Sequence, residues 1–152
     1  MLSRIAIENP RQPEIMALLA QSDIDYAGLY PGESNHLLDV SSLAAPEVTF
    51  LVARVSGSAA GFGALLRHGA AFGEVKRMYV APAMRARKLG RLLLSALEDH
   101  ARTDGLPCVR LETGIRQPEA VALYRSAGYR EIPPFGDYAP DALSIFMEKQ
   151  LA

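Results

Sequence analysis

A short basic segment between an apolar run and an amphipathic helix carries the first chemistry that the sequence suggests. The apolar run ends at Pro82, Gly90 opens the helix, and three cations lie between them: Arg85, Arg87 and Lys88. Free backbone N–H groups and the positive end of the helix dipole favour an anion at a helix start. Cationic side chains strengthen the preference for phosphate. The segment indicates either a phosphate-binding loop or a solvated basic loop, and its spacing alone leaves both interpretations open.

Two further side chains have types suited to acid–base chemistry. Glu74 stands at the head of the apolar run, and Tyr124 lies in a later helical pattern. If the strands that precede and position them are adjacent, the two groups can face one cleft as base and acid. Glu74 could instead be an exposed carboxylate at a strand end, and Tyr124 a half-buried core residue whose hydroxyl bonds to water. The residues alone do not decide between these alternatives.

Several common catalytic and metal-binding patterns are missing from the sequence. It contains neither G-x-G-x-x-G, a P-loop, H-E-x-x-H nor G-x-S-x-G. The three histidines, His36, His68 and His100, lie far apart, and His100 suits the C-terminal end of a helix. Cys108 is the only cysteine, which excludes an intramolecular disulfide and a cysteine-based zinc site. We expect Cys108 to be a buried, inert thiol and the protein to use no metal.

The bulk composition is that of an ordinary globular protein. The chain has 152 residues, 49% of them hydrophobic and 22% charged, which predicts a single domain over residues 1–152. Its net charge of −1 gives no overall field that would attract nucleic acid or an anionic membrane. No signal peptide and no membrane-spanning apolar stretch is recognisable, so we expect a cytoplasmic protein.

The hydrophobic periodicity predicts the elements that would position these side chains. The clearest helix follows Gly90, because leucines and alanines recur there at a spacing of three and four residues. Hairpins come first and a β–α–β crossover follows, which predicts an α/β fold of the α+β type with a mixed, mostly antiparallel sheet of about seven strands and helices on both faces. The expected strands are 5–7, 48–55, 60–67, 74–80, 109–113, 129–132 and 144–149, and the expected helices begin near Pro13, Gly90 and Pro118, with a further one at 33–38.

Three stretches, taken in their order along the chain, carry a family resemblance. They are EVKRMYV from Glu74 to Val80, RARKLG from Arg85 to Gly90, and QPEAVALYRSAGY from Gln117 to Tyr129. Together they resemble the fourth strand, the cofactor signature [R/Q]-x-x-G-x-[G/A] and the later N-x-x-A-x-x-L-Y-x-x-x-G-[F/Y] motif of the GCN5-related N-acetyltransferases. Lys88 replaces the middle glycine of the signature, and Gln117 replaces the asparagine.

The resemblance implies that acetyl-CoA is the acyl donor. Strands four and five would splay apart, so that pantetheine pairs with the backbone of the fourth strand like an added strand, and the diphosphate would sit on the loop and helix start. The cofactor-binding residues implied are Met78, Tyr79, Val80, Arg85, Ala86, Arg87, Lys88, Leu89, Gly90, Arg91 and Gln117. We expect Lys88 to be right-handed, as an approach to a helix suggests, in which case its side chain carries little backbone strain.

The resemblance also implies a direct attack of an amine on the thioester carbonyl. Glu74 would take the proton of the amine, directly or through water. A backbone N–H near Val80 would stabilise the charge that develops on the carbonyl oxygen. Tyr124 matches the tyrosine that protonates the departing thiolate.

The acceptor is not identified by these residues. We expect it to be a primary amine of a small molecule or peptide, contacted by Tyr30, Glu33 and Tyr138, whose aromatic and acidic groups suit a cation. The same residues could be solvated loop residues. Two other classes stay open: a non-catalytic acyl-CoA-binding sensor or interaction module, and a nucleic-acid binder, which the balanced charge disfavours. A homodimer is possible.

Overall fold

A single seven-stranded sheet organises the chain. The computed structural model describes residues 3–29 and 38–151. The strands are β1 (Ser3–Ile7), β2 (Val48–Val55), β3 (Ser58–His68), β4 (Phe72–Val80), β5 (Cys108–Gly114), β6 (Arg130–Ile132) and β7 (Ser144–Gln150), and the helical elements are α1 (Pro13–Ala27), α2 (Val40–Leu43), the 3₁₀ helix η2 (Pro82–Arg87), α3 (Leu89–Thr103) and α4 (Pro118–Ser126).

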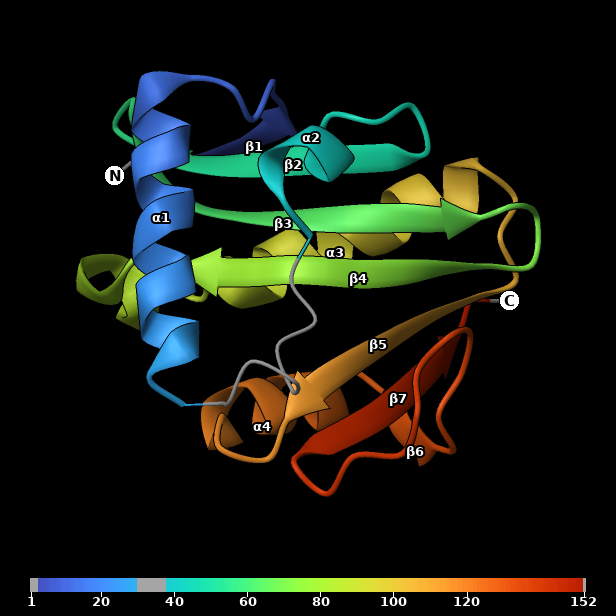
Figure 1. Cartoon of the computed structure of the whole chain (residues 1–152). Helices are drawn as coiled ribbons and strands as arrows, with labels where there is room; N and C mark the ends of the chain where they lie inside the picture. Colours follow the sequence, from blue (N-terminus) through green and yellow to red (C-terminus); the bar gives the residue numbers. More distant parts are fainter. Residues whose placement is uncertain (1–2, 30–37, 152) are drawn as a thin grey trace.

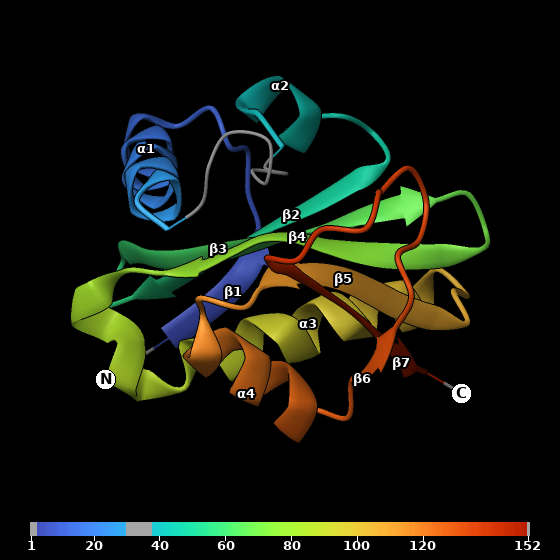
Figure 2. The same cartoon turned by 60° about the horizontal axis from the view of Figure 1, so that its bottom comes forward.

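The strand order in the sheet is β1-β2-β3-β4-β5-β7-β6. Only the β4–β5 pair is parallel, because α3 returns the chain between them, and the other neighbouring strands are antiparallel. Helices α1 and α2 cover one face and α3 and α4 cover the other (Figures 1 and 2). The predicted mixed sheet with helices on both faces is confirmed.

Each face of the sheet contributes to its own apolar core. Under α3, Leu93, Leu97 and Ala101 recur every four residues and are fully buried. Under α1 and α2, the core includes Ile15, Leu19, Leu43, Phe50 and Phe62. Because helices cover both faces, strand β2 is buried along almost its whole length instead of alternating.

Two local features differ from the sequence prediction. Helix α2 was not predicted, although Asp39 caps it by accepting a hydrogen bond from the backbone N–H of Ser42 at 2.8 Å. The basic loop is a 3₁₀ helix, η2, that begins at Pro82. The helix predicted at 33–38 falls almost wholly outside the described residues.

Within residues 3–29 and 38–151, no helix is both long and apolar enough to cross a bilayer.

Candidate active site

Strands β4 and β5 pair for only a short distance and then separate. Their ladder consists of Gly73–Val109, Glu74–Arg110 and Val75–Leu111. Figure 1 shows β5 turning away from β4 beyond this point. Among the described residues, the second half of β4 therefore pairs with β3 on one side and with no strand on the other, a separation from β5 that we call the gap. This is the splay that the sequence analysis predicted for strands four and five.

The main chain of β4 at Val80 is directed into this gap. The Ala81 N–H donates to the Ala60 carbonyl at 2.7 Å, so these two residues form a hydrogen-bonded antiparallel pair. The adjacent pair, Gly61 and Val80, is therefore a non-hydrogen-bonded pair. In such a pair the N–H and C=O groups of each residue point away from the partner strand. The N–H of Val80 consequently faces the side that β5 has left.

A β-bulge lies between this end of β4 and its paired half. Phe62 faces Tyr79 and Ala64 faces Lys76, so β4 carries one more residue than β3 across this stretch. Arg77, in the bulge, has a φ of +57°, which for a non-glycine residue costs about 1–2 kcal/mol. Gly63 lies opposite, where a Cβ would come within 2.7 Å of the Met78 sulfur. The missing side chain of Gly63 is therefore what makes room for Met78.

The end of β4 leads through η2 to the N-terminus of α3, where Lys88 corrects a prediction. Lys88 has φ 58° and ψ 23°, the left-handed conformation, whereas we expected it to be right-handed. The reason is geometric: η2 ends at Arg87 and α3 begins at Leu89, so one residue must redirect the chain between two right-handed helices. A lysine at this position accepts about 1–2 kcal/mol of strain that a glycine would avoid.

The start of α3 has the properties of an anion site. No side chain in the described part of the chain caps it, and the first intrahelical bond runs from the Leu92 N–H to the Lys88 carbonyl at 3.2 Å. The amides of Leu89, Gly90 and Arg91 thus precede the helical hydrogen-bond ladder. A Cβ on Gly90 would lie 3.3 Å from Leu123, so the glycine lets α4 pack closely here. These residues fit a diphosphate group.

The predicted cofactor side chains do not all point the same way. Arg85 donates through Nε to the Val80 carbonyl at 3.0 Å and lies over the ring of Tyr79. Arg91 donates to the Ser126 hydroxyl at 2.9 Å. Ala86 and Arg87 contribute backbone to η2, and Gln117 is the residue before α4, its N–H bonded to the Gly114 carbonyl at 3.1 Å.

Glu74 is the most enclosed carboxylate on the α1 side of the sheet. The residue is only 2% exposed, so it is not the solvated strand-end carboxylate that the sequence left open. Its Oε1 lies 2.9 Å from Nε2 of His68, and its Oε2 accepts a hydrogen bond from the Tyr138 hydroxyl at 2.6 Å. The Lys76 ammonium lies 3.3 Å from Oε2. A buried carboxylate held by several donors keeps one fixed orientation.

The neighbours of Glu74 were not predicted as site residues, apart from Tyr138. Two-residue alternation places Phe72, Glu74 and Lys76 on one face of β4, and the hairpin register brings His68 beside them. That hairpin is the signal in the sequence that could have identified His68 and Lys76. Tyr138 comes from the loop before β7, which no local pattern relates to β4.

Tyr138 is held against Glu74 by aromatic packing. Its ring meets Phe135 at 5.2 Å and Phe146 at 5.3 Å between centroids, both edge-on. The Lys76 ammonium donates to its hydroxyl at 2.5 Å. Burial, together with the nearby Glu74 carboxylate, raises the pKa of Tyr138 far above its usual range. The phenol therefore stays protonated and acts as a donor to Glu74.

Tyr124 lies on the opposite face of the sheet from Glu74. It belongs to the core under α3 and α4, which also contains Val75, and Val75 is next to Glu74 on β4 and so points the other way. Burial raises the pKa of Tyr124 well above its usual range, so its hydroxyl keeps its proton. Within residues 3–29 and 38–151 that hydroxyl makes no hydrogen bond. The two predicted acid–base residues therefore lie on opposite faces of the sheet.

Helix α1 brings acidic side chains to the end of β4. Asp25 accepts a hydrogen bond from the Tyr79 hydroxyl at 2.5 Å, and Asp23 pairs with Arg77. Burial and then this bond raise the pKa of Tyr79 to about 12. The bond from Tyr79 also lowers the pKa of Asp25. Asp23 and Asp25 were not predicted as site residues. Tyr30 and Glu33, which were predicted as acceptor contacts, lie outside the described residues.

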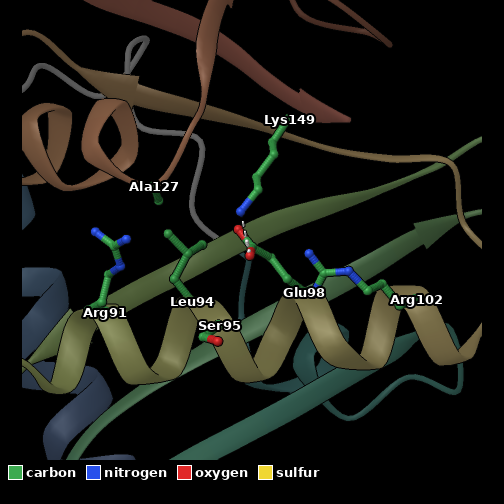
Figure 3. Close-up of a pocket in the computed structure, with 7 residues that line it drawn as sticks. All are labelled: Arg91, Leu94, Ser95, Glu98, Arg102, Ala127 and Lys149. Carbon is green, nitrogen blue, oxygen red and sulfur yellow. Dashed lines mark hydrogen bonds and ion pairs between the residues drawn. The ribbon is translucent and has the colours of Figure 1, made fainter. Parts of the chain in front are cut away.

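A polar hollow lies on the opposite face, along α3 (Figure 3). The buried Glu98 accepts hydrogen bonds from Lys149 at 2.9 Å and from Tyr129 at 2.8 Å, which fasten α3 to the C-terminal part of the chain. The lining residues are Arg91, Leu94, Ser95, Glu98, Arg102, Ala127 and Lys149. The hollow begins beside the first turn of α3 and is separate from the Glu74 cluster.

Comparison with known proteins places the chain in a known family. The acetyltransferase (GNAT) family profile matches residues 15–129. The IAA acetyltransferase of Azospirillum brasilense is 49% identical over 148 residues, 97% of each chain. A crystal structure of a Klebsiella pneumoniae protein described as an acyl-CoA N-acyltransferase has a TM-score of 0.84 and 38% identity, covering 99% of each chain.

Solved structures of the same fold include complexes with coenzyme A. The PaiA N-acetyltransferase of Thermoplasma acidophilum, in complex with coenzyme A, has a TM-score of 0.76 at 20% identity and covers 99% of each chain. The present chain belongs to the GNAT acetyltransferase family. It is an acyl-CoA-dependent N-acetyltransferase, and the family resemblance of its three motifs is confirmed.

Proposed function

We propose that the protein transfers the acetyl group of acetyl-CoA to a primary amine of a small molecule or peptide, by direct attack in a ternary complex. The observation that carries the proposal is the gap between β4 and β5, which has Glu74 on one face, Tyr124 on the other and an uncapped helix start at its end. Acetyl-CoA supplies an activated thioester. Residues of the chain bind it, transfer protons and stabilise the charge that develops.

The donor is held mainly by main chain. The amides of Leu89, Gly90 and Arg91 bind the diphosphate, helped by the exposed cation of Lys88. The unpaired side of β4 from Met78 to Val80 binds the pantetheine arm by strand addition. Arg85 supports this edge indirectly, because it bonds the Val80 carbonyl. Gln117 contributes from the turn before α4.

Glu74 is the base in this proposal. Its carboxylate accepts a proton from the attacking amine, directly or through one water, while Tyr138 and His68 keep it oriented. The ion pair with Lys76 compensates the buried anion. The amine therefore approaches from the face that carries α1.

The opposite face supplies the acid. The N–H of Val80 stabilises negative charge on the carbonyl oxygen as the amine adds. Tyr124, which stays protonated because it is buried, gives its proton to the leaving sulfur. The donor and the acceptor then enter from opposite faces of the sheet and meet in the gap. Tyr138, Tyr30 and Glu33 remain the proposed acceptor contacts, with Tyr138 also orienting the base.

The activity is tested by following free thiol while acetyl-CoA is mixed with a panel of primary amines. We expect thiol release that depends on both the enzyme and at least one amine. Saturable binding of acetyl-CoA with no amine-dependent thiol release would contradict the transferase proposal and favour a sensor. The panel should include amino acids, polyamines, aminoalkyl phosphonates and peptides with free N-termini, because the residues do not name the acceptor.

Glu74→Gln tests the base. The variant keeps the size of the side chain but cannot take up the proton, so kcat should fall by about 100-fold and the pH dependence of kcat should flatten. Glu47→Gln, an exposed glutamate outside the site, is the matched control and should leave both unchanged. Unaltered kcat and pH dependence in Glu74→Gln would remove Glu74 from the mechanism.

A further inference from the structure

Arg77 combines three unusual properties at one position. It adopts a positive φ of 57° although it is not glycine. Its side chain is only 4% exposed. Within the described residues, its Nε is the one buried side-chain nitrogen or oxygen atom that has no hydrogen-bond partner. A strained backbone and an unsatisfied buried donor persist only where the surrounding structure requires them.

The side chain of Arg77 is fastened to helix α1. Nη1 forms an ion pair with Asp23, and Nη2 donates to the Leu19 carbonyl at 3.4 Å and to the Ser22 hydroxyl at 3.3 Å. The guanidinium also lies 6.0 Å from the centroid of Phe62, on β3. All of the polar contacts come from consecutive turns of α1, which crosses this end of the sheet (Figure 1).

The backbone of Arg77 forms the bulge between the two halves of β4 that have different roles in the proposed reaction. On one side are Glu74 and Lys76, and on the other are Met78 and Val80, whose main chain borders the gap. A change in the bulge would rotate these halves relative to each other. The bulge therefore sets the position of the base relative to the N–H of Val80.

We propose that Arg77 is a positioning residue for the transfer reaction. Its anchor on α1 fixes the bulge of β4, and so holds the Val80 N–H and the Glu74 carboxylate in register with each other. This inference rests on the proposed function. It adds that α1, which lies on the acceptor side, controls catalytic geometry through a buried arginine rather than only lining the site.

Variants at position 77 separate anchoring from backbone strain. Arg77→Gly removes the anchor and also removes the strain, since glycine adopts positive φ freely. Arg77→Ala removes the anchor and keeps the strain. Arg77→Lys keeps the charge but not the fork of donors, and Asp23→Asn weakens the anchor from α1 while leaving the arginine. Ser56→Gly is the matched control, because Ser56 also has a positive φ, 52°, in a turn outside the site.

The readouts are kcat at saturating acetyl-CoA, and the affinity and stoichiometry of acetyl-CoA by calorimetry. We expect Arg77→Gly to lower kcat by about tenfold or more, since displacements near 1 Å are costly in catalysis. Its affinity for acetyl-CoA should fall less than kcat does, because the diphosphate site is not altered even where the pantetheine edge of β4 shifts. The kcat values of Asp23→Asn and Arg77→Lys should lie between those of Arg77→Gly and the wild type. Ser56→Gly should match the wild type in both kcat and affinity.

Three results have distinct meanings. If Arg77→Gly matches the wild type in kcat, the side chain serves only to stabilise the strained backbone and the proposal is overturned. If kcat and binding stoichiometry fall together in every variant, Arg77 acts only through folding, which also overturns it. If the wild type itself fails to bind acetyl-CoA, the proposed function fails first. A reduced kcat at a stoichiometry of one supports the positioning role.

Discussion

The proposed proton transfers depend on which buried side chains keep their protons. Tyr124 and Tyr138 are both buried phenols whose pKa values are raised by burial, but they differ in their partners. Tyr138 already donates to Glu74, whereas the hydroxyl of Tyr124 has no hydrogen-bond partner within the described residues. Tyr124 therefore has a proton available for a ligand, and Tyr138 does not.

Tyr124→Phe should lower kcat by about 100-fold with a much smaller change in KM for acetyl-CoA. The free energy of unfolding should change by less than about 0.5 kcal/mol, because the ring stays in the core and no internal hydrogen bond is lost. Steady-state kinetics and chemical denaturation measure the two effects.

Tyr129→Phe is the matched control with the opposite signature. It breaks the hydrogen bond to Glu98, so the protein should lose about 1–2 kcal/mol of stability while kcat stays close to the wild-type value. Equal losses in kcat and in acetyl-CoA affinity for Tyr124→Phe would instead make Tyr124 a binding residue.

Lys88 is the second residue whose conformation leads to a prediction. Lys88→Gly should raise the free energy of unfolding by about 1 kcal/mol, because glycine adopts the left-handed conformation without strain. Lys88→Ala loses the same cation but keeps the strain, so its stability should stay near that of the wild type. Equal stabilities of the two variants in denaturant titrations would show that the strain at this position is negligible.

Packing at the scale of elements fixes α3, the helix that presents the anion site. Its apolar stripe is buried under the sheet, and the pair of the buried Glu98 with Lys149 ties the helix to β7 (Figure 3). Breaking one partner of a buried pair leaves an uncompensated charge, whereas removing the charge from both is far less costly. The helix should therefore depend on this pair as a unit.

Lys149→Met should lower the free energy of unfolding by about 2–3 kcal/mol, because the Glu98 carboxylate is left with Tyr129 alone. Adding Glu98→Gln to this variant should recover at least about half of the loss, since the amide can still accept from Tyr129. A double-mutant cycle measured by chemical denaturation gives the coupling. Additive losses would contradict a coupled pair.

The elements were predicted from the sequence better than the contacts between them. Helix α3 and the succession of strands and helices along the chain follow from local periodicity and turn residues, and the motif at residues 85–90 correctly marks a helix start. The surroundings of Glu74 could not be predicted, because Tyr138 reaches it from a distant loop and the Asp23–Arg77 pair joins α1 to β4. Lys88 was assigned the wrong conformation, since only the angle between η2 and α3 requires a left-handed residue there.

Charged side chains are neutralised locally, in networks of ion pairs that join separate elements of the molecule. Arg54 on β2 forms a fork with Glu8 at 2.8 and 2.9 Å and also bonds Glu14 of α1 at 2.7 Å. This network joins the N-terminal strand, the central sheet and α1. The hydrogen bond from Arg54 is the main reason why the pKa of Glu8 is lowered from 4.5, against the effect of partial burial.

The sign of the pH dependence follows from this lowered pKa. A carboxylate whose pKa is lower in the folded state stabilises the fold fully above its unfolded value, about 4.5, and loses that contribution as the pH falls through the folded value. The carboxylate of Glu8 becomes protonated between about pH 5 and pH 3. Over this range, the free energy of unfolding of Glu8→Gln should fall less steeply than that of the wild type. Identical slopes in denaturation series at each pH would show that this pair is not linked to folding.

In the proposed function, the gap between β4 and β5 and the start of α3 together bind acetyl-CoA. Calorimetry with acetyl-CoA and with S-acetylpantetheine, which lacks the diphosphate and the nucleoside, tests this directly. We predict one site per chain for acetyl-CoA and at least about tenfold weaker binding of S-acetylpantetheine, because charge-assisted bonds to the amides of residues 89–91 are lost. No binding of acetyl-CoA by folded protein, or equal affinity for both ligands, would contradict it.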